Sequence, residues 1–267
     1  MGKAIVITSG KGGVGKTTTV ANIGAALAAL GKRVALVDAD IGLRNLDLFM
    51  GLENRVVYNL VDVVEGVVDW RKALVKDKQF ETNLMLLPSA QARDKTAVTP
   101  RQMAKLVKEV KEEFDFVLID CPAGIEQGFK NAMAGADEAI VVVNPEVPSV
   151  RDADRVVGLL DSERVEKIYL VINRLKPELV RKGEMLETQD VVDLLAVTLL
   201  GVVPEDERVV IATNRGEPLA LDGLNSRAGL AYRNIARRLC GEDVPIAEWR
   251  ENSSFLGRLR KIMGMGD

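Results

Sequence analysis

The stretch TSGKGGVGKTTT, residues 8–19, decides the fold. It satisfies the phosphate-loop pattern G-x-x-x-x-G-K-[ST], whose fixed positions are held by Gly10, Gly15, Lys16 and Thr17. An apolar run at 4–8 predicts a strand before the loop, and apolar residues at helical spacing over 17–31 predict a helix after it. Backbone N–H groups in such a loop face a phosphate, and the dipole of the following helix favours its charge. The stretch therefore predicts a nucleotide phosphate site.

Two side chains of this loop have roles that the pattern itself predicts. Lys16 is expected to reach the β and γ phosphates, and the Thr17 hydroxyl is expected to ligate Mg²⁺. A second lysine, Lys11, follows the first glycine directly, and the ordinary pattern does not require it. The residues of the loop expected to bind the nucleotide are Gly10, Lys11, Gly12, Gly13, Val14, Gly15, Lys16, Thr17 and Thr18.

Further short apolar runs alternate with helical segments along the chain. The runs lie at 33–40, 84–88, 116–122, 138–145, 167–173 and 199–203, and several are apolar on both faces. Such runs are typical of parallel strands between helix layers. Helices are predicted at 99–114, with Thr99 as N-cap, and at 147–162. The fold class predicted is α/β, with a doubly wound, mostly parallel sheet flanked by helices. We expect an ATPase domain over 1–250 and a tail over 251–267.

Composition excludes several kinds of chemistry. The chain of 267 residues has a formal net charge of −3 and no histidine, which removes histidine bases, histidine metal ligands and serine–histidine triads. Its two cysteines, Cys121 and Cys240, lie far apart, so a zinc or iron–sulfur site within one chain is not favoured. There is no signal-peptide layout and no apolar run of about 18 residues, which predicts a cytoplasmic chain.

Carboxylates at the ends of two predicted strands are candidates for the metal and the attacking water. Asp120 ends the apolar run FVLID and is interpreted as the Walker B aspartate, acting on Mg²⁺ through a water. Asp38 and Asp40 end another run and are expected to point in different directions. One could serve the metal and the other the water. Because histidine is absent, a carboxylate is the group expected to orient that water.

The motif KGGVGKTT resembles the deviant Walker A motif of the ParA/MinD family of ATPases. The stretches at 38–51, 120–126, 144–155 and 202–209 resemble the division-site branch of that family, and the similarity runs through nearly the whole chain. The resemblance implies hydrolysis of ATP with Mg²⁺ and an ATP-dependent homodimer. It also implies a role for Lys11, which would reach across the dimer to the phosphates bound by the partner subunit.

The resemblance also assigns roles to residues outside the loop. It implies that Asp40 activates the water and that Asp38 and Asp120 lie on the metal side. Asn173 would read the adenine edge, and the loop flanking the base would contain Pro204, Glu205 and Asp206. Switch and dimer residues would be Asn45 in the first switch, Gly124 in the second switch, and Asp152, which would couple the dimer face to Lys11.

Partners follow from the same resemblance. It implies recruitment of a septum inhibitor (MinC-like), a hydrolysis activator (MinE-like), and attachment to the inner face of the cell membrane when ATP is bound. No nucleic acid is expected as a partner, since the net charge is −3.

The tail SSFLGRLRKIMGMGD, residues 253–267, has the layout of an interfacial helix. At ~100° per residue the apolar side chains fall within an arc of roughly 120°, with basic residues outside it. The residues expected to contact the membrane are Phe255, Leu256, Arg258, Leu259, Arg260, Lys261, Ile262 and Met263. One such tail would bind weakly, and two tails on a dimer would bind far more strongly.

Three alternatives stay open at this point. A ParA-type DNA-segregation ATPase would need a basic patch, for which RNIARRL (233–239) is the candidate, although a solvated helix face explains it more simply. A nitrogenase-reductase-like or scaffold protein with an iron–sulfur cluster at a dimer interface would have only Cys121 and Cys240 as ligands, and Cys121 is expected to be a packed thiol. Finally, the tail could be a last helix that packs on its own domain.

Overall fold

The fold was obtained as a computed structural model, which describes residues 2–93, 97–222 and 226–249. These residues form one sheet of eight strands in the order β3-β4-β2-β5-β1-β6-β7-β8. Every neighbouring pair is parallel except β3 with β4. The strands are β1 (Lys3–Thr8), β2 (Val34–Asp38), β3 (Val75–Lys76), β4 (Leu84–Leu87), β5 (Phe116–Asp120), β6 (Glu138–Val143), β7 (Lys167–Leu175) and β8 (Thr198–Pro204).

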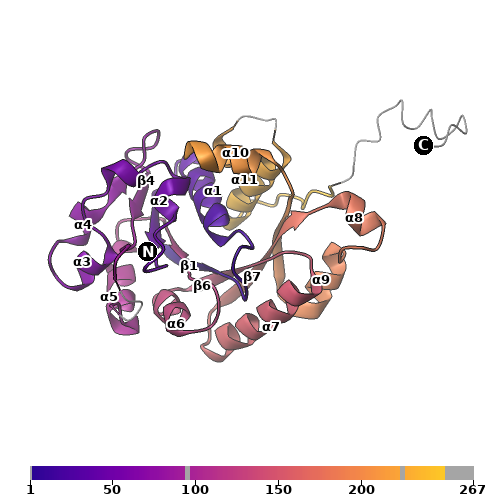
Figure 1. The fold of residues 1–267 in the computed structure, drawn as a ribbon, viewed down its shortest axis with the longest axis horizontal. Coiled ribbons are helices and arrows are strands. Elements are labelled where there is room, and N and C mark those ends of the chain that lie inside the picture. The colour runs from indigo at the N-terminus through magenta and orange to yellow at the C-terminus, as the bar shows by residue number, and fades with distance from the viewer. Residues whose placement is uncertain (1, 94–96, 223–225, 250–267) are drawn as a thin grey trace, which may run out of the picture.

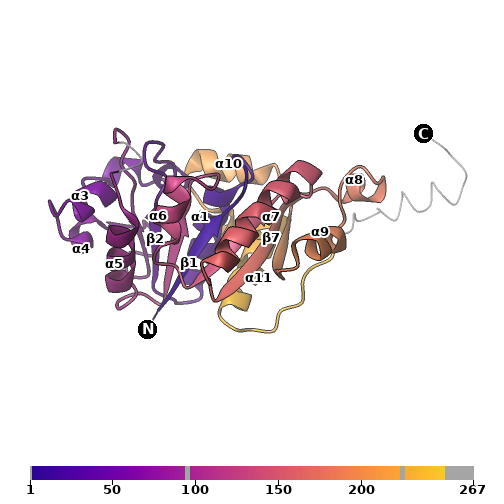
Figure 2. The same cartoon turned by 90° about the horizontal axis from the view of Figure 1, so that it is seen from below.

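Helices cover both faces of this sheet. The α-helices are α1 (Lys16–Ala29), α2 (Leu46–Phe49), α3 (Leu60–Val64), α4 (Trp70–Ala73), α5 (Pro100–Val110), α6 (Gln127–Met133), α7 (Val147–Ser162), α8 (Pro177–Arg181), α9 (Thr188–Leu195), α10 (Arg208–Arg215) and α11 (Arg227–Leu239). Two 3₁₀ turns, η1 (Glu53–Arg55) and η2 (Leu219–Leu221), complete the described elements. Figure 1 shows α1, α10 and α11 on one side of the sheet and α6 and α7 on the other. Figure 2 shows the second layer, with α5, α6 and α7 side by side across the strands.

Strand β1 shows why the run at its position is apolar throughout. Ala4 and Val6 join the core formed with α5, α6 and α7, whereas Ile5 and Ile7 join the core formed with α1 and α11. Successive side chains of a strand point to opposite faces, so a central strand between two helix layers needs apolar residues at every position. The prediction of a doubly wound, mostly parallel sheet is confirmed.

The predicted strands and the three predicted helices lie where periodicity placed them, with small shifts at their ends. Helix α1 ends at Ala29, and Gly31 follows in the left-handed region with φ +78°. Helix α5 begins with a capping box between Thr99 and Gln102. One detail was wrong: β2 ends at Asp38, so Asp40 lies in the following loop. Residues two apart on a strand point to the same face of the sheet. The different directions expected for Asp38 and Asp40 therefore require Asp40 to lie in the loop.

Two glycines bring α2 and α10 into backbone contact. Gly51 follows α2 and has φ +62°, and Gly216 follows α10 and has φ +63°. A Cβ on Gly216 would lie 2.4 Å from the Cα of Gly51, and a Cβ on Gly51 would lie 2.8 Å from the carbonyl O of Gly216. Any side chain at either position would therefore separate the two segments.

Candidate nucleotide-binding site

The phosphate loop lies between β1 and α1, at the carboxyl end of the central strands. Two of its glycines adopt conformations that disfavour other residues, since φ is +77° at Gly13 and +100° at Gly15. Gly15 is also crowded, because a Cβ there would lie 2.3 Å from Nδ2 of Asn173. Gly10 is packed against α7, where its Cβ would lie 2.3 Å from the backbone of Asp152. The loop therefore requires glycine for both torsion and space.

The two lysines of the loop have opposite surroundings. Lys16 is 9% exposed, and its Nζ donates a hydrogen bond of 3.0 Å to the Ser9 hydroxyl. Lys11 has an exposed side chain, and its backbone carbonyl accepts a hydrogen bond of 2.7 Å from the same hydroxyl. Ser9 is a residue that pattern reasoning missed. It lies inside the quoted stretch but one residue before the phosphate-loop pattern begins at Gly10, so the pattern makes no requirement at its position.

Two aspartates come together at the ends of neighbouring strands. Asp38 ends β2 and Asp120 ends β5, and the register of the parallel pair sets them opposite each other. Both are buried, at 1% and 2% exposure. Asp38 accepts backbone hydrogen bonds from Asp40 at 3.0 Å and from Leu46 at 3.3 Å. The Thr17 hydroxyl lies close to the Asp120 carboxyl, whose Oδ1 has no hydrogen-bond partner in the described part of the chain.

Burial controls the protonation of this pair. Desolvation raises the pKa of Asp120 to about 7, although the Thr17 hydrogen bond and the Lys16 ammonium lower it. Desolvation, and then the nearby charge of Asp120, raise the pKa of Asp38 well above its usual range. Two buried carboxylates side by side in the nucleotide-free protein therefore favour protons, and a bound cation would reverse that preference.

The residues present fit Mg²⁺. The Asp120 Oδ1 that lacks a partner is a hard oxygen ligand, and the Thr17 hydroxyl close to Asp120 supplies another oxygen. No group of three or more His, Cys, Asp or Glu side chains that could hold a metal occurs among the described residues. Mg²⁺ is bound by one or two carboxylates together with waters and phosphates, so the oxygens of Asp120 and Thr17 are ligands of the required kind.

The structure brings four more predicted residues to this end of the sheet. Asp40 lies half-buried in the loop after Asp38, and Asn45 lies exposed at the start of α2 without a capping side-chain bond. Asp152 lies half-buried in α7, directly against Gly10. Gly124, with φ +91°, donates a backbone hydrogen bond of 3.4 Å to the Ser9 carbonyl. The two loops after β2 and β5 therefore border the phosphate loop.

The residues predicted to read or flank the adenine base line one hollow beside α1. Thr18, Asn173, Pro204, Glu205 and Asp206 share it, and buried Tyr232 lies at its edge. Asn173 does more than line the hollow, because its Nδ2 donates 2.8 Å to the carbonyl O of Val14. Its amide therefore also anchors the phosphate loop.

The carboxylate of Asp206 accepts hydrogen bonds from other residues of the protein. Its carboxylate accepts a bond of 2.9 Å from the Ser226 hydroxyl and bonds of 3.0 Å from Arg208. Although burial alone raises the pKa of Asp206, the bonds from Arg208 and Ser226 hold it below its usual value. Asp206 thus ties α10 to the first turn of α11 and stays charged.

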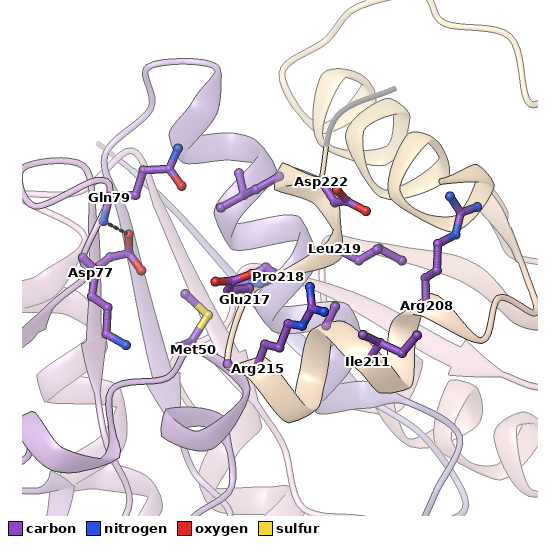
Figure 3. A pocket seen from close by; sticks show the side chains of 14 residues that line it. Met50, Asp77, Gln79, Arg208, Ile211, Arg215, Glu217, Pro218, Leu219 and Asp222 are labelled. Carbon is purple, nitrogen blue, oxygen red and sulfur yellow. Dashed lines mark hydrogen bonds between the residues drawn. The ribbon is translucent and has the colours of Figure 1, made fainter. Parts of the chain in front are cut away.

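A larger hollow of about 640 Å³ lies between α10, η2 and the loop before β4. Figure 3 shows Asp77 and Gln79 on one side and Arg208, Ile211 and Arg215 on the other. Of the residues predicted to bind nucleotide, metal or partner, none lines it. The volume of a hollow therefore does not identify the nucleotide site. The polar groups that converge around Lys16 identify it.

Comparison with known proteins decides the family. The profile of the CobQ/CobB/MinD/ParA nucleotide binding domain matches residues 5–219. The septum site-determining protein MinD of Bacillus subtilis is 57% identical over 267 residues, covering 99% of each chain. The chain belongs to the MinD family of septum site-determining proteins.

Solved structures of MinD proteins have the same fold. The chain in the MinC:MinD cell division protein complex of Aquifex aeolicus has a TM-score of 0.86 and 51% identity, covering 93% of this chain and 100% of that one. MinD of Pyrococcus horikoshii, complexed with Mg-ADP, has a TM-score of 0.81 and 32% identity, with coverage of 90% and 96%. Membership in the MinD family confirms the prediction of an Mg²⁺-dependent ATPase that acts in positioning the division site.

The membrane-contacting residues predicted from the MinD resemblance lie outside the described residues. These are Phe255, Leu256, Arg258, Leu259, Arg260, Lys261, Ile262 and Met263, and the whole predicted tail, 251–267, likewise lies outside the described residues. In the part that the structure describes, no helix is long and apolar enough to span a bilayer.

The buried Asp120 predicts an unusual pH dependence for the nucleotide-free protein. Its folded pKa of about 7 lies above its usual value, so this group's stabilising contribution is complete below about pH 4 and is lost as the pH rises through 7. Asp120→Asn should therefore gain stability relative to the native chain as pH rises, by roughly 2–4 kcal/mol at about pH 8. Urea unfolding without Mg²⁺ or nucleotide measures this.

The control is Asp161→Asn, an exposed carboxylate on α7. It should show no difference from the native chain across the same pH range. Equal stability of Asp120→Asn and the native chain at about pH 8 would show that Asp120 titrates normally.

Proposed function

We propose that the chain is an ATP-driven dimerisation and membrane-binding switch that positions the division site. The observation that carries this proposal is that the two lysines of the loop have opposite surroundings. Lys16 points inward to its own loop, whereas the Lys11 ammonium is exposed and forms no hydrogen bond or ion pair with the described residues. An exposed cation at the mouth of a preformed phosphate loop suits the phosphates of a second subunit.

In this proposal the residues of the loop act on ATP as follows. Backbone N–H groups from Gly10 to Thr18 hold the phosphates, and Lys16 neutralises charge on the transferring group. Mg²⁺, when bound through Thr17 and Asp120 with Asp38 behind them, neutralises further charge on the phosphates. Lys11 of each subunit supplies a cation in trans, as an arginine finger does.

Hydrolysis also needs a positioned water, and the nucleotide must be bound through its adenine base. We assign Asp40 to the water, because it lies beside the buried pair of aspartates and no histidine exists in the chain. We assign Asn173, Pro204, Glu205 and Asp206 to the base side, because they line one hollow next to Thr18. Asp206 would act there through the loop that it fixes.

A MinC-like inhibitor is the proposed partner of the ATP-bound dimer. The related Aquifex aeolicus protein has been solved in a MinC:MinD complex, and the chains match over 93% of this one. Asp152 lies directly against Gly10 of the Lys11 loop, so a dimer formed through Lys11 would include it in its face. Asn45, exposed at the start of α2, is assigned to the first switch. A MinE-like activator is proposed to release hydrolysis from that dimer.

Membrane attachment is proposed to depend on residues 251–267. Their basic residues would meet anionic headgroups, and their apolar residues would enter the acyl boundary. Since two tails bind far more strongly than one, the dimer would attach to the inner face of the cell membrane and the monomer would stay cytoplasmic.

Liposome co-sedimentation tests this attachment. We expect the full chain to sediment with anionic vesicles in ATP and to stay in the supernatant in ADP, without nucleotide, or with neutral lipid. A 1–252 truncation should not sediment in any condition.

Two point variants sharpen the same experiment. Ile262→Glu places a charge inside the predicted apolar arc and should abolish sedimentation. Met265→Glu places the same charge outside that arc and should retain most of it. Full sedimentation of the truncation would remove the tail from the proposal.

The structure gives a specific reason to disfavour the DNA-segregation alternative. The three arginines of 233–239 are engaged by the protein itself. Arg233 donates to the Ala220 carbonyl, Arg237 pairs with Glu242, and Arg238 donates to three carbonyls, including that of Leu200 at 2.7 Å. The expectation of a solvated face therefore holds only in part. Salt-dependent binding of duplex DNA would revive the alternative.

The cysteines also argue against an iron–sulfur scaffold. Cys121 is 1% exposed at the carboxyl end of β5, and burial raises its pKa to about 12. Cys240 lies at the opposite end of the sheet, where it lines a hollow with Gly2, Lys3 and Arg33. The two thiols of one chain cannot ligate the same cluster, and burial of Cys121 keeps it from a cluster at a dimer interface, which supports the prediction that Cys121 is a packed thiol.

A further inference from the structure

Ser9 occupies a junction between three parts of the site. It follows β1 directly and is fully buried, with 0% exposure. Its hydroxyl accepts a hydrogen bond of 3.0 Å from Lys16 Nζ and donates one of 2.7 Å to the Lys11 carbonyl. Its own carbonyl accepts a bond of 3.4 Å from the Gly124 N–H. One small residue thus contacts both lysines of the loop and the segment after β5.

The chemistry of these groups fixes the direction of every bond. An ammonium has three donors and no acceptor, so the Ser9 oxygen must be the acceptor in its bond with Lys16. A serine hydroxyl has a single proton, and the Lys11 carbonyl can only accept. The proton of Ser9 therefore points to Lys11, and a lone pair of the same oxygen points to Lys16. The hydroxyl has one arrangement that satisfies both partners.

Burial of Lys16 makes its hydrogen bond to Ser9 energetically important. Lys16 is 9% exposed, and a buried ammonium that lacks acceptors is costly. The bond to Ser9 is charge-assisted and is therefore stronger than a bond between neutral groups. Because it is made without a nucleotide, it holds the lysine inside the loop before any phosphate arrives.

We propose that Ser9 is a positioning residue that preorganises Lys16 for the β and γ phosphates while fixing the backbone at Lys11. This inference rests on the proposed function, since it assumes that the loop binds a nucleotide. Preorganisation lowers the cost of binding, because the side chain need not be ordered when the ligand enters. The effect should therefore appear only for ligands that carry a phosphate within reach of Lys16.

A second buried serine provides a matched control. Ser89 is also 0% exposed, and its hydroxyl has no hydrogen-bond partner in the described ranges. Ser89→Ala removes a buried hydroxyl of the same kind without touching the loop. Any loss that Ser9→Ala shows beyond Ser89→Ala then belongs to the bonds of Ser9 and not to the deletion of an oxygen atom.

The test is the affinity for three nucleotides, measured by calorimetry with Mg²⁺ on the full chain. Ser9→Ala should bind ADP and a non-hydrolysable ATP analogue roughly 10- to 100-fold more weakly than the native chain. AMP ends at the α-phosphate, which Lys16 is not expected to contact. Its affinity should therefore change by less than about threefold. Ser89→Ala should match the native chain for all three.

Several outcomes would overturn the inference. Unchanged ADP affinity in Ser9→Ala would remove the role, and equal weakening of AMP and ADP would show a general disturbance of the loop. If Ser9→Ala does not fold, Ser9→Cys fills the site with a slightly larger side chain that is only a weak acceptor, and it gives the same comparison. A native chain that binds neither ADP nor the ATP analogue would instead overturn the proposed function.

Discussion

Lys11→Ala should abolish ATP-dependent dimerisation while leaving a folded monomer. The Lys11 side chain is exposed and makes no bond to the described residues, so its removal costs the monomer little. Its backbone carbonyl, which accepts from Ser9, is retained in the variant. Light scattering after gel filtration, with and without a slowly hydrolysed ATP analogue, should show a monomer in both conditions.

The loss of activity in Lys11→Ala should be large. A cation supplied in trans contributes about 10³- to 10⁵-fold to hydrolysis in other phosphoryl-transfer enzymes, so ATPase activity should fall by at least ~1,000-fold. Lys105→Ala, which removes an exposed lysine from α5, is the control and should dimerise and hydrolyse normally. A Lys11→Ala chain that still forms a dimer with ATP would assign the dimer contact to other residues.

Asp40→Ala should separate ATP binding from ATP hydrolysis. Asp40 lies beside the phosphate loop and holds no direct position in it, so affinity for ATP should stay within about threefold. Loss of the group that orients the water should lower turnover by ~100- to 10,000-fold. The ATP-bound dimer would then persist, and we expect it to remain on anionic vesicles.

Single-turnover hydrolysis of radiolabelled ATP, together with gel filtration, measures both effects. Asp193→Ala, at an exposed carboxylate of α9, is the control and should hydrolyse ATP at the native rate. Normal turnover in Asp40→Ala would move the water-positioning role to Asp38 or to a backbone group.

Local patterns were sufficient to predict the frame of the fold. The strand–loop–helix unit around Lys16 follows from the motif, and Val147–Ser162 lies where its apolar spacing predicted a helix. Parallel strands buried on both faces are continuous apolar runs, so β1, β5 and β6 were found easily. Strand β3 was not predicted, because two residues carry no period and its antiparallel pairing with β4 is a long-range choice.

Side-chain partners were harder to predict than elements. Asp38 and Asp120 were found because each ends an apolar run, and parallel register then brings them together. The bond from Asn173 to Val14 joins residues 159 positions apart, and no local signal marks it. Asp206 sits in a stretch that resembles the base-flanking loop, yet its carboxylate is used by Arg208 and Ser226. Such pairings depend on the folded arrangement.

The contact between Gly51 and Gly216 has a mechanical consequence. Gly51 ends the segment that begins at the metal side with Asp38, and Gly216 ends the helix that follows the base-side loop at Pro204. With no side chain between them, neither backbone can move toward the other, and a shift in that direction must be transmitted. The two backbones thus touch outside the nucleotide site, and a displacement of the segment after β2 toward α10 would displace α10 as well.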